Sequence, residues 1–111
     1  MAGVLRGEIR WAELDSTRGN EQQGKCPVLI FSHDFFNERS GTALAMAITS
    51  QPQRAGFLLT LPLGTLGDNE AWLKISQVRV LSTQRLGRKL GKATPEQLAQ
   101  AIDGLNEIVG D

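Results

Sequence analysis

Residues 94–110 carry the clearest structural signal in the chain. Thr94 can cap a helix, Pro95 occupies the first helical position, and Gln97 completes the T-x-x-Q pattern of a capping box. Apolar residues then recur at helical spacing until Gly110, which ends the segment. These apolar residues are Leu98, Ala101, Ile102, Leu105, Ile108 and Val109. The pattern predicts an amphipathic C-terminal α-helix whose apolar stripe packs on the rest of the fold.

The segments before this helix read as short strands. Residues 7–14 alternate between apolar and polar side chains, and residues 27–32 and 42–49 are apolar runs typical of buried strands. A further strand is predicted from four residues that share one face, namely Phe57, Leu59, Leu61 and Leu63. Residues 63–69 are then expected to turn. Two more short strands are predicted within 72–83, where the apolar alternation slips between Ile75 and Val78 and indicates a bulge or a change of strand.

The connections complete the prediction of the fold class. Residues 15–25 are polar and contain two glycines, which indicates a loop longer than an ordinary hairpin connection. Residues 33–40 are predicted to form a turn or a short helix that ends at Gly41. Pattern alone therefore predicts a mainly β small barrel with a short helix after the second strand and a C-terminal α-helix.

Length and composition restrict the class of protein. At 111 residues, with 41% hydrophobic and 22% charged residues, the chain is expected to be one soluble domain over 1–111. The longest apolar run, 43–48, is too short to span a membrane, and charges within 1–11 argue against a secretory leader. A single cysteine, Cys26, excludes an internal disulfide and fits a reducing cytoplasm, which is the expected location.

The charges are unevenly distributed although the formal net charge is zero. Residues 72–92 contain six basic residues and no acidic ones, whereas residues 93–111 contain four acidic residues and no basic ones. The six are Lys74, Arg79, Arg85, Arg88, Lys89 and Lys92. Such a segment could face phosphates. From spacing alone, the favoured interpretation is a solvated face balanced by the acidic helix.

Generic catalytic motifs are absent from the sequence. One histidine and one cysteine cannot supply the usual ligands of a zinc site, and neither a P-loop nor a GxGxxG motif occurs, so no metal or cofactor is expected. His33 beside Asp34 could act as an oriented base, but a turn residue that caps the following segment is favoured. Cys26 beside Lys25 could be a nucleophilic thiolate, but a small buried residue at the start of a strand is favoured.

A series of motifs nevertheless points to one family. They are RGEIRW at 6–11, LD at 14–15, TRGNEQQG at 17–24, VLIFS at 28–32 followed by Asp34, Phe36 and Asn37, ITSQ at 48–51, FLLTL at 57–61, QVR at 77–79, RL at 85–86, and TPE at 94–96. Their kinds and their order are similar to those of the MazF/PemK toxins, whose patterns include RGDIWxVDLDPTxGxEQxGxRP, SxDxFN, xTSx, PFxVxL and DQVR. The chain therefore resembles this family over nearly its whole length.

The resemblance implies an SH3-like barrel that forms a homodimer, with single-stranded RNA bound in a groove between the protomers. It implies a toxin of a type II toxin–antitoxin system, a metal-independent endoribonuclease in which a ribose 2′-hydroxyl attacks the adjacent phosphate. A cognate antitoxin would fill the same groove with an acidic tail. Thr49 and Glu21 match family residues of the catalytic site. The RNA-binding positions implied are Arg18, Gln22, Ser50, Gln51, Gln77 and Arg79.

Two positions depart from the family pattern. Cys26 stands where the family has the arginine of GxRP, and Ser76 stands where it has the aspartate of DQ. A thiol supplies neither a permanent charge nor a bidentate donor to a phosphate. Lys25 or Arg18 could reach the phosphate instead, although Lys25 should point to the opposite face from Cys26. Alternatively, the chain is an inactive relative that keeps the antitoxin-binding surface, or Cys26 is an introduced change.

Three functions are therefore carried forward. The first is an endoribonuclease toxin, and the second is a catalytically silent barrel that binds antitoxin or RNA. The third is a gyrase inhibitor of the CcdB type, which shares the fold; the EQxG loop and the TS pair favour the ribonuclease lineage over it. The sequence does not specify the RNA motif that would be cut.

Overall fold

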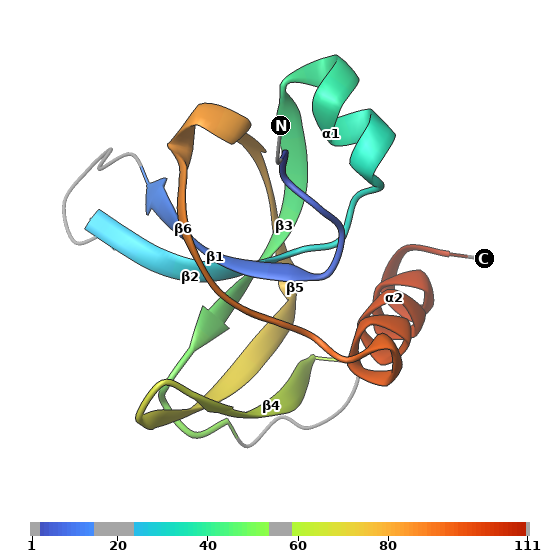
Figure 1. Cartoon of the computed structure of the whole chain (residues 1–111). Helices are drawn as coiled ribbons and strands as arrows, with labels where there is room; N and C mark the ends of the chain where they lie inside the picture. Colours follow the sequence, from blue (N-terminus) through green and yellow to red (C-terminus); the bar gives the residue numbers. More distant parts are fainter. Residues whose placement is uncertain (1–2, 15–23, 54–58, 111) are drawn as a thin grey trace, which may run out of the picture.

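The structure is a computed structural model that describes residues 3–14, 24–53 and 59–110. Six strands, two α-helices and one 3-10 helix make up these residues (Figure 1). In chain order they are β1 (Glu8–Leu14), β2 (Gly24–Ile30), α1 (Asp34–Ser40), β3 (Thr42–Thr49), β4 (Thr60–Leu66), β5 (Asn69–Ser82), η1 (Thr83–Arg85), β6 (Leu86–Lys92) and α2 (Pro95–Val109). The prediction of a mainly β chain with a short helix after the second strand and a C-terminal helix is confirmed.

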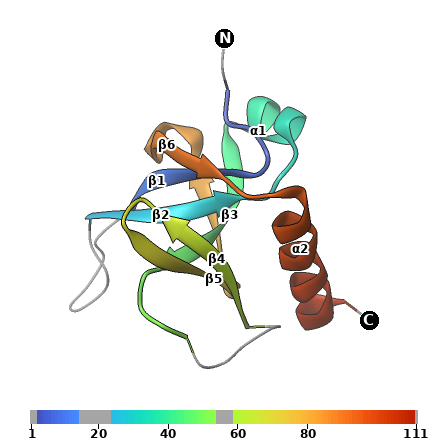
Figure 2. The same ribbon diagram turned by 60° about the horizontal axis from the view of Figure 1, so that its bottom comes forward.

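All six strands belong to one antiparallel sheet, in the order β4-β5-β3-β2-β1-β6. The sheet curls into a half-barrel, and α2 lies beside it against β4 and β5 (Figure 2). Because β4 and β6 are the two edges of the sheet, the curl brings side chains from distant parts of the chain around one hollow.

Strand alternation divides the core into two clusters. Leu29 and Met46 point to the face that α2 covers, together with Leu73 and Ile75, and all four are fully buried. Val28 points to the opposite face, where a second cluster of mostly small residues also contains Cys26. Burial of this apolar surface is the main force that holds the sheet in its curled form.

The C-terminal helix forms as predicted. Thr94 Oγ1 accepts a hydrogen bond from the backbone N–H of Gln97 at 3.0 Å, and the Gln97 side chain accepts one from the Thr94 N–H, also at 3.0 Å. Ala101 is fully buried in the core. The predicted stripe is wrong only for its last turn, where Ile108 and Val109 are 42% and 70% exposed because the covered sheet face ends before the helix does.

The short helix α1 also forms where it was predicted. Gly41 ends it with a φ of 71°, in the left-handed region that glycine adopts without strain. Asn37 is buried and donates to the backbone oxygens of Val4 and Ser32, and its side chain also contacts the Ser32 hydroxyl. These contacts fix the N-terminal segment and the start of α1 to the sheet.

Strand boundaries were predicted less well in the second half of the chain. The turn expected over 63–69 is present but shorter than predicted, because β4 runs to Leu66 and β5 begins at Asn69. Strand β6 was not predicted, and the strand expected at 27–32 is β2, which begins at Gly24 and ends at Ile30. Cross-strand pairing set these limits, and it was not visible in the local pattern.

The slip in the apolar alternation marks a bulge rather than a change of strand. The two short strands expected within 72–83 are parts of one strand, β5, which pairs with β3 along its length. Met46 lies opposite Val78, but the next residue, Ala47, lies opposite Lys74, so the register shifts there. None of the helices in the described residues is long and apolar enough to cross a membrane.

Candidate functional site

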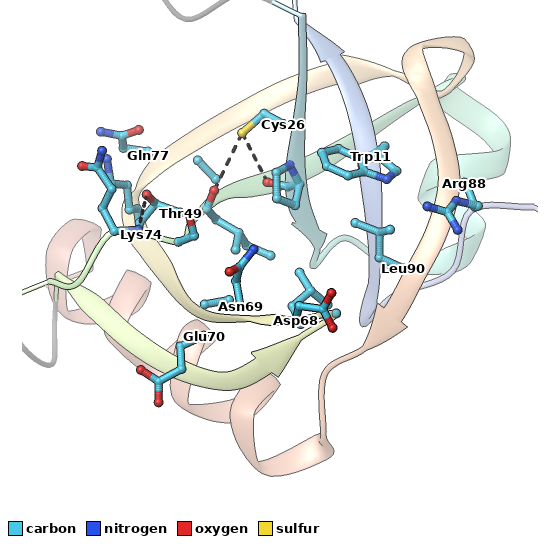
Figure 3. A pocket seen from close by; sticks show the side chains of 18 of the residues that line it. Trp11, Cys26, Thr49, Asp68, Asn69, Glu70, Lys74, Gln77, Arg88 and Leu90 are labelled. Atoms are coloured by element: carbon cyan, nitrogen blue, oxygen red, sulfur yellow. Dashed lines mark hydrogen bonds between the residues drawn. The ribbon is translucent and has the colours of Figure 1, made fainter.

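A cleft of about 690 Å³ opens where the C-terminal end of β3 meets β2 and β5. Residues from all six strands and from the β4–β5 turn line it, including Trp11, Cys26, Thr49, Lys74 and Arg88 (Figure 3). No two of these five residues lie on the same strand. The cleft is therefore a product of the curl of the sheet and not of any local motif.

Cys26 is a buried residue of the cleft, as its favoured interpretation predicted. Its side chain is part of the second core cluster, and the residue is 3% exposed. The thiol lies 3.5 Å from the Pro27 carbonyl oxygen and 3.8 Å from the Ile48 carbonyl oxygen (Figure 3). A thiol is a weak donor, so these contacts hold it in the wall of the cleft without adding charge.

Lys25 lies outside the wall of the cleft. It is exposed and is not among the residues that line the cleft, whereas its neighbour Cys26 is buried. Successive residues of a strand point to opposite faces, and β2 is regular here, with Lys25 opposite Glu13 and Cys26 opposite Ala12. This geometry disfavours the explanation in which Lys25 reaches the phosphate.

The end of β3 places three of the predicted site residues together. Thr49, Ser50 and Gln51 all line the cleft. The Thr49 hydroxyl oxygen accepts a hydrogen bond from the Gln51 backbone N–H at 3.2 Å. Because the oxygen acts only as the acceptor in this bond, the hydroxyl proton can still be donated to a ligand.

The bulge in β5 decides which of its polar residues reach the cleft. Lys74 and Gln77 both line it, although residues three apart on a regular strand would face opposite sides. Arg79, a predicted RNA-binding residue, lies opposite Ala45, is exposed and does not line the cleft. We refer below to Thr49, Lys74 and Gln77 as the Thr49 wall (Figure 3).

Several residues of the cleft were not among the predicted site residues. They are Trp11, Asp68, Asn69, Glu70, Lys74, Arg88 and Lys89. The signal for three of them was the basic segment 72–92, which was interpreted as a solvated face. Arg88 and Lys89 are exposed, as that interpretation predicted, but they also line the cleft, as does the partly buried Lys74; the other three basic residues of the segment do not line it.

A buried carboxylate lies behind one side of the cleft. Glu8 is 4% exposed and accepts hydrogen bonds from the Leu5 N–H at 3.0 Å and from Arg10 Nε at 2.8 Å. Its second oxygen lies 3.9 Å from Lys89 Nζ. Burial raises the pKa of Glu8, but the bonds from Leu5 and Arg10 and the charges of Arg10 and Lys89 lower it by more, so this pKa lies below its ordinary value of 4.5. We call Glu8, Arg10 and Lys89 the Glu8 cluster.

His33 and Asp34 do not form a base with its orienter. His33 is exposed at the N-cap position of α1, makes no side-chain cap bond there, and lies with its ring 5.9 Å from that of Phe35. Asp34 Oδ1 instead accepts a hydrogen bond from the Arg6 backbone N–H at 2.7 Å. Neither residue lines the cleft.

Three predicted site residues fall on the loop before β2. Arg18, Glu21 and Gln22 lie outside the described residues, as does Phe57 of the strand predicted to contain Leu59, Leu61 and Leu63. Within the described residues, no group of three or more histidine, cysteine, aspartate or glutamate side chains could hold a metal ion.

Comparisons with known proteins agree on one family. Residues 5–109 match the model of the PemK-like, MazF-like toxin of type II toxin–antitoxin systems. The chain is 30% identical over 105 residues to Endoribonuclease EndoA of Bacillus subtilis (strain 168), an alignment that covers 92% of this chain and 90% of that protein.

Solved structures show the same fold. MazF from Deinococcus radiodurans superposes with a TM-score of 0.81 at 24% identity, with all of both chains covered. An endoribonuclease from a mycobacterial species, solved in complex with its cognate antitoxin, superposes with a TM-score of 0.78 at 22% identity, covering 97% of this chain and 96% of that one. The half-barrel closed by a C-terminal helix is therefore a fold that solved structures share.

Proposed function

This chain belongs to the PemK-like, MazF-like toxin family of type II toxin–antitoxin systems, and from that premise we propose that it is an endoribonuclease that cuts single-stranded RNA. The observation that carries the proposal is the cleft in which Thr49, Ser50 and Gln51 lie beside basic residues of β5 and β6. Hydroxyl and amide groups beside cations suit the backbone of an RNA strand.

In the proposed reaction, the ribose 2′-hydroxyl loses its proton and its oxygen bonds to the adjacent phosphorus. The bond from phosphorus to the 5′-oxygen breaks, and that oxygen takes up a proton. The products are a 2′,3′-cyclic phosphate and a 5′-hydroxyl. The nucleophile belongs to the RNA, so the protein must provide a proton acceptor, a proton donor and groups that stabilise the charge on the phosphate. We propose that this reaction needs no metal.

Two groups are proposed for these roles. The Thr49 hydroxyl can donate to a phosphate oxygen, because its own hydrogen bond to Gln51 leaves the proton available. Glu21 is proposed to help order the site, with Arg18 and Gln22 of the same loop as RNA contacts. The amides of Gln51 and Gln77 line the cleft and can bind base edges or phosphate oxygens.

A specific observation also supports a second candidate function, that of a silent binding module. Cys26 is buried and carries no permanent charge at the position where the family has an arginine. A barrel without that charge could still hold an antitoxin or an RNA. Trapping of gyrase on DNA would be needed to revive the third candidate, a gyrase inhibitor.

The proposed partners are a cognate antitoxin and a second copy of the chain. A mycobacterial endoribonuclease and MazF of Deinococcus radiodurans have both been solved with antitoxins. In this chain Arg88 and Lys89 offer positive charge in the cleft to an acidic antitoxin tail. We expect the free protein to be a dimer by light scattering at micromolar concentration. A monomer would count against the shared RNA groove.

The experiment that tests the function is cleavage of a long unstructured RNA in EDTA by the natural chain and by a Cys26→Arg variant. Cutting by both would support the endoribonuclease function and show that another group takes the role of the arginine. Cutting by the variant alone would identify a ribonuclease scaffold that Cys26 has silenced. If neither cuts while the variant is folded and dimeric, the binding role replaces the nuclease.

A further inference from the structure

We propose that Lys74 binds the RNA phosphate that lies against Thr49 and supplies the positive charge that Cys26 cannot. The inference rests on the proposed function, since it names the group that contacts the phosphate in the same cleft. It is carried by the register of three neighbouring strands and by the proximity of Lys89, another cation of the cleft, to the Glu8 carboxylate.

The register places Lys74 on the same face of the sheet as Cys26 and Thr49. Ala47 of β3 lies between Val28 of β2 and Lys74 of β5, and directly opposite residues on adjacent strands share a face. Cys26 and Thr49 are each two residues from their partners in that row, Val28 and Ala47, and therefore point to the same face. Adjacent strands are separated by about 4.8 Å, so the long side chain of Lys74 can reach the Thr49 hydroxyl region.

The close view agrees with the register. Lys74, Thr49 and Gln77 lie together on one side of the cleft, while Trp11 and Arg88 lie on the other side (Figure 3). A phosphate within reach of the Thr49 hydroxyl is therefore on the Lys74 side. Lys74 is also partly buried, so its side chain lies along the wall of the cleft rather than free in solvent.

The cations of the cleft differ in their partners. Lys89 Nζ lies 3.9 Å from the Glu8 carboxylate, which offsets part of its charge. In the described part of the chain Lys74 forms no ion pair, and Glu70, an acidic residue of the same cleft, points away from it (Figure 3). A lysine in a cleft without a carboxylate partner among the described residues is suited to an anionic ligand. A phosphate beside Thr49 is the anion that the proposed function provides.

Lysine also fits the proposed task chemically. Its ammonium is a compact point charge on a flexible stem, and it can donate up to three hydrogen bonds to phosphate oxygens without the fixed planar geometry of a guanidinium. The charge would thus come to the phosphate from β5, on the opposite side of β3 from the strand that carries Cys26.

The test compares Lys74→Gln, which removes the charge, with Lys74→Arg, which keeps it. Arg39→Gln is the matched control, because it removes one exposed positive charge from α1, which contacts the opposite end of β3 from the cleft. The probe is a short fluorescein-labelled RNA with 2′-O-methyl groups throughout, which cannot be cut. Its affinity is measured by anisotropy over a range of salt concentrations.

We expect Lys74→Gln to reduce the slope of log affinity against log salt by about 0.7, the value for one fewer phosphate contact on a single strand. Lys74→Arg and Arg39→Gln should leave the slope unchanged. An unchanged slope in Lys74→Gln, or the same loss in Arg39→Gln, overturns the inference. Absence of any binding by the natural chain also overturns it.

Cleavage of an unmodified RNA then separates this inference from the proposed function. If the parent chain cuts, Lys74→Gln should slow its single-turnover cleavage on the order of 10²-fold, the typical cost of a lost charge-stabilising group. In the Cys26→Arg background the loss should be smaller, because the new guanidinium supplies part of the charge. Binding that depends on Lys74 without cleavage in any background would support the inference and reject the nuclease. If RNA is cut and neither binding nor cleavage changes in Lys74→Gln, the nuclease is supported and the inference about Lys74 is rejected.

Discussion

The Thr49 wall lines the cleft and the Glu8 cluster reaches it only through Lys89, and the polar groups of the two regions are satisfied in different ways. In the Glu8 cluster, one carboxylate accepts from the Leu5 N–H and from Arg10, and it lies near Lys89. Arg10 in turn donates to the Gly87 carbonyl oxygen at 3.0 Å, so the cluster ties β1 to β6. On the Thr49 wall, the Thr49 hydroxyl accepts a hydrogen bond from the backbone N–H of Gln51, two residues along the chain.

This difference indicates which polar groups are available to bind a ligand. The hydrogen bonds and ion pairs of a buried, fully paired charge already stabilise the fold. Removing one partner leaves the remaining polar groups without a partner. A polar group at the mouth of a cleft that bonds only a close neighbour in the chain can exchange water for a ligand at little cost to stability. We therefore expect substitutions in the Glu8 cluster to change folding and substitutions in the Thr49 wall to change function.

The largest effect is expected from Thr49→Val, which keeps the shape of the side chain and removes the hydroxyl. Cleavage should fall on the order of 10²–10³-fold, because a donor to the phosphate is lost. The free energy of unfolding should change by less than about 0.5 kcal/mol, since the site is at the surface end of β3. Single-turnover cleavage and urea unfolding measure the two quantities.

Thr49→Ser is the control for this prediction, because it keeps a hydroxyl at the same position. It should retain most of the cleavage rate. If Thr49→Val cuts RNA as fast as the parent protein, Thr49 is not the donor. The expectation that substitutions in the Thr49 wall change function would then be contradicted.

The next largest effect is expected from Glu8→Gln. The variant should lose about 2 kcal/mol of unfolding free energy, because Arg10 loses its charged partner in a buried setting. The folded fraction should still bind and cut RNA at the parental rate. Urea denaturation at neutral pH measures the loss, with Glu13→Gln as the exposed carboxylate control on the same strand. Equal stability of the two variants would show that the Glu8 cluster does not hold the fold.

A smaller effect is expected from pH. The pKa of Glu8 is lowered in the folded state, so its contribution to stability is complete above the ordinary value of 4.5 and is lost as pH falls through the lower folded value. The urea midpoint of the natural chain should therefore fall as the pH is lowered from 4.5 through the folded pKa of Glu8. The Glu8→Gln variant should show a shallower fall over the same interval. Parallel curves for the two proteins would contradict the assignment to Glu8.

The smallest effect is expected from Lys89→Gln, which lies where the two regions meet. Lys89 is exposed and 3.9 Å from Glu8, so its loss should cost less than about 0.5 kcal/mol of stability. It should also reduce the salt dependence of RNA binding by less than Lys74→Gln does, because Glu8 already offsets part of its charge. A larger reduction for Lys89→Gln would place the phosphate on the β6 side of the cleft.

The predictions made from the sequence were most accurate where short-range contacts decide the structure. The helix α2 begins at its capping box and α1 ends at Gly41 because both signals involve residues within one helical turn. Strand β3 spans Thr42–Thr49, the predicted range, because it is buried on both faces and its apolar run has clear ends. The motifs and their order are also sufficient to identify the family without tertiary information.

The candidate site was predicted only in part. The motif at the end of β3 correctly placed Thr49, Ser50 and Gln51 together, because they are consecutive. The basic segment gave no means of telling Lys74, which lines the cleft, from Arg79, which does not. That distinction depends on the shifted pairing of β5 with β3, which the local pattern indicates only as a slip in the apolar alternation.

The sequence by itself determined the family, the caps and ends of the helices, and the buried position of Cys26, since each depends on local chemistry or on a motif read in order. Only the tertiary structure decided that Lys25 faces away from the cleft, that Glu8 is buried among cations, and that Lys74 lies on the Thr49 side. The physical reason is that a curled sheet joins residues through pairing between distant strands. A one-residue change of that register moves a side chain to the other face, and local pattern does not specify it.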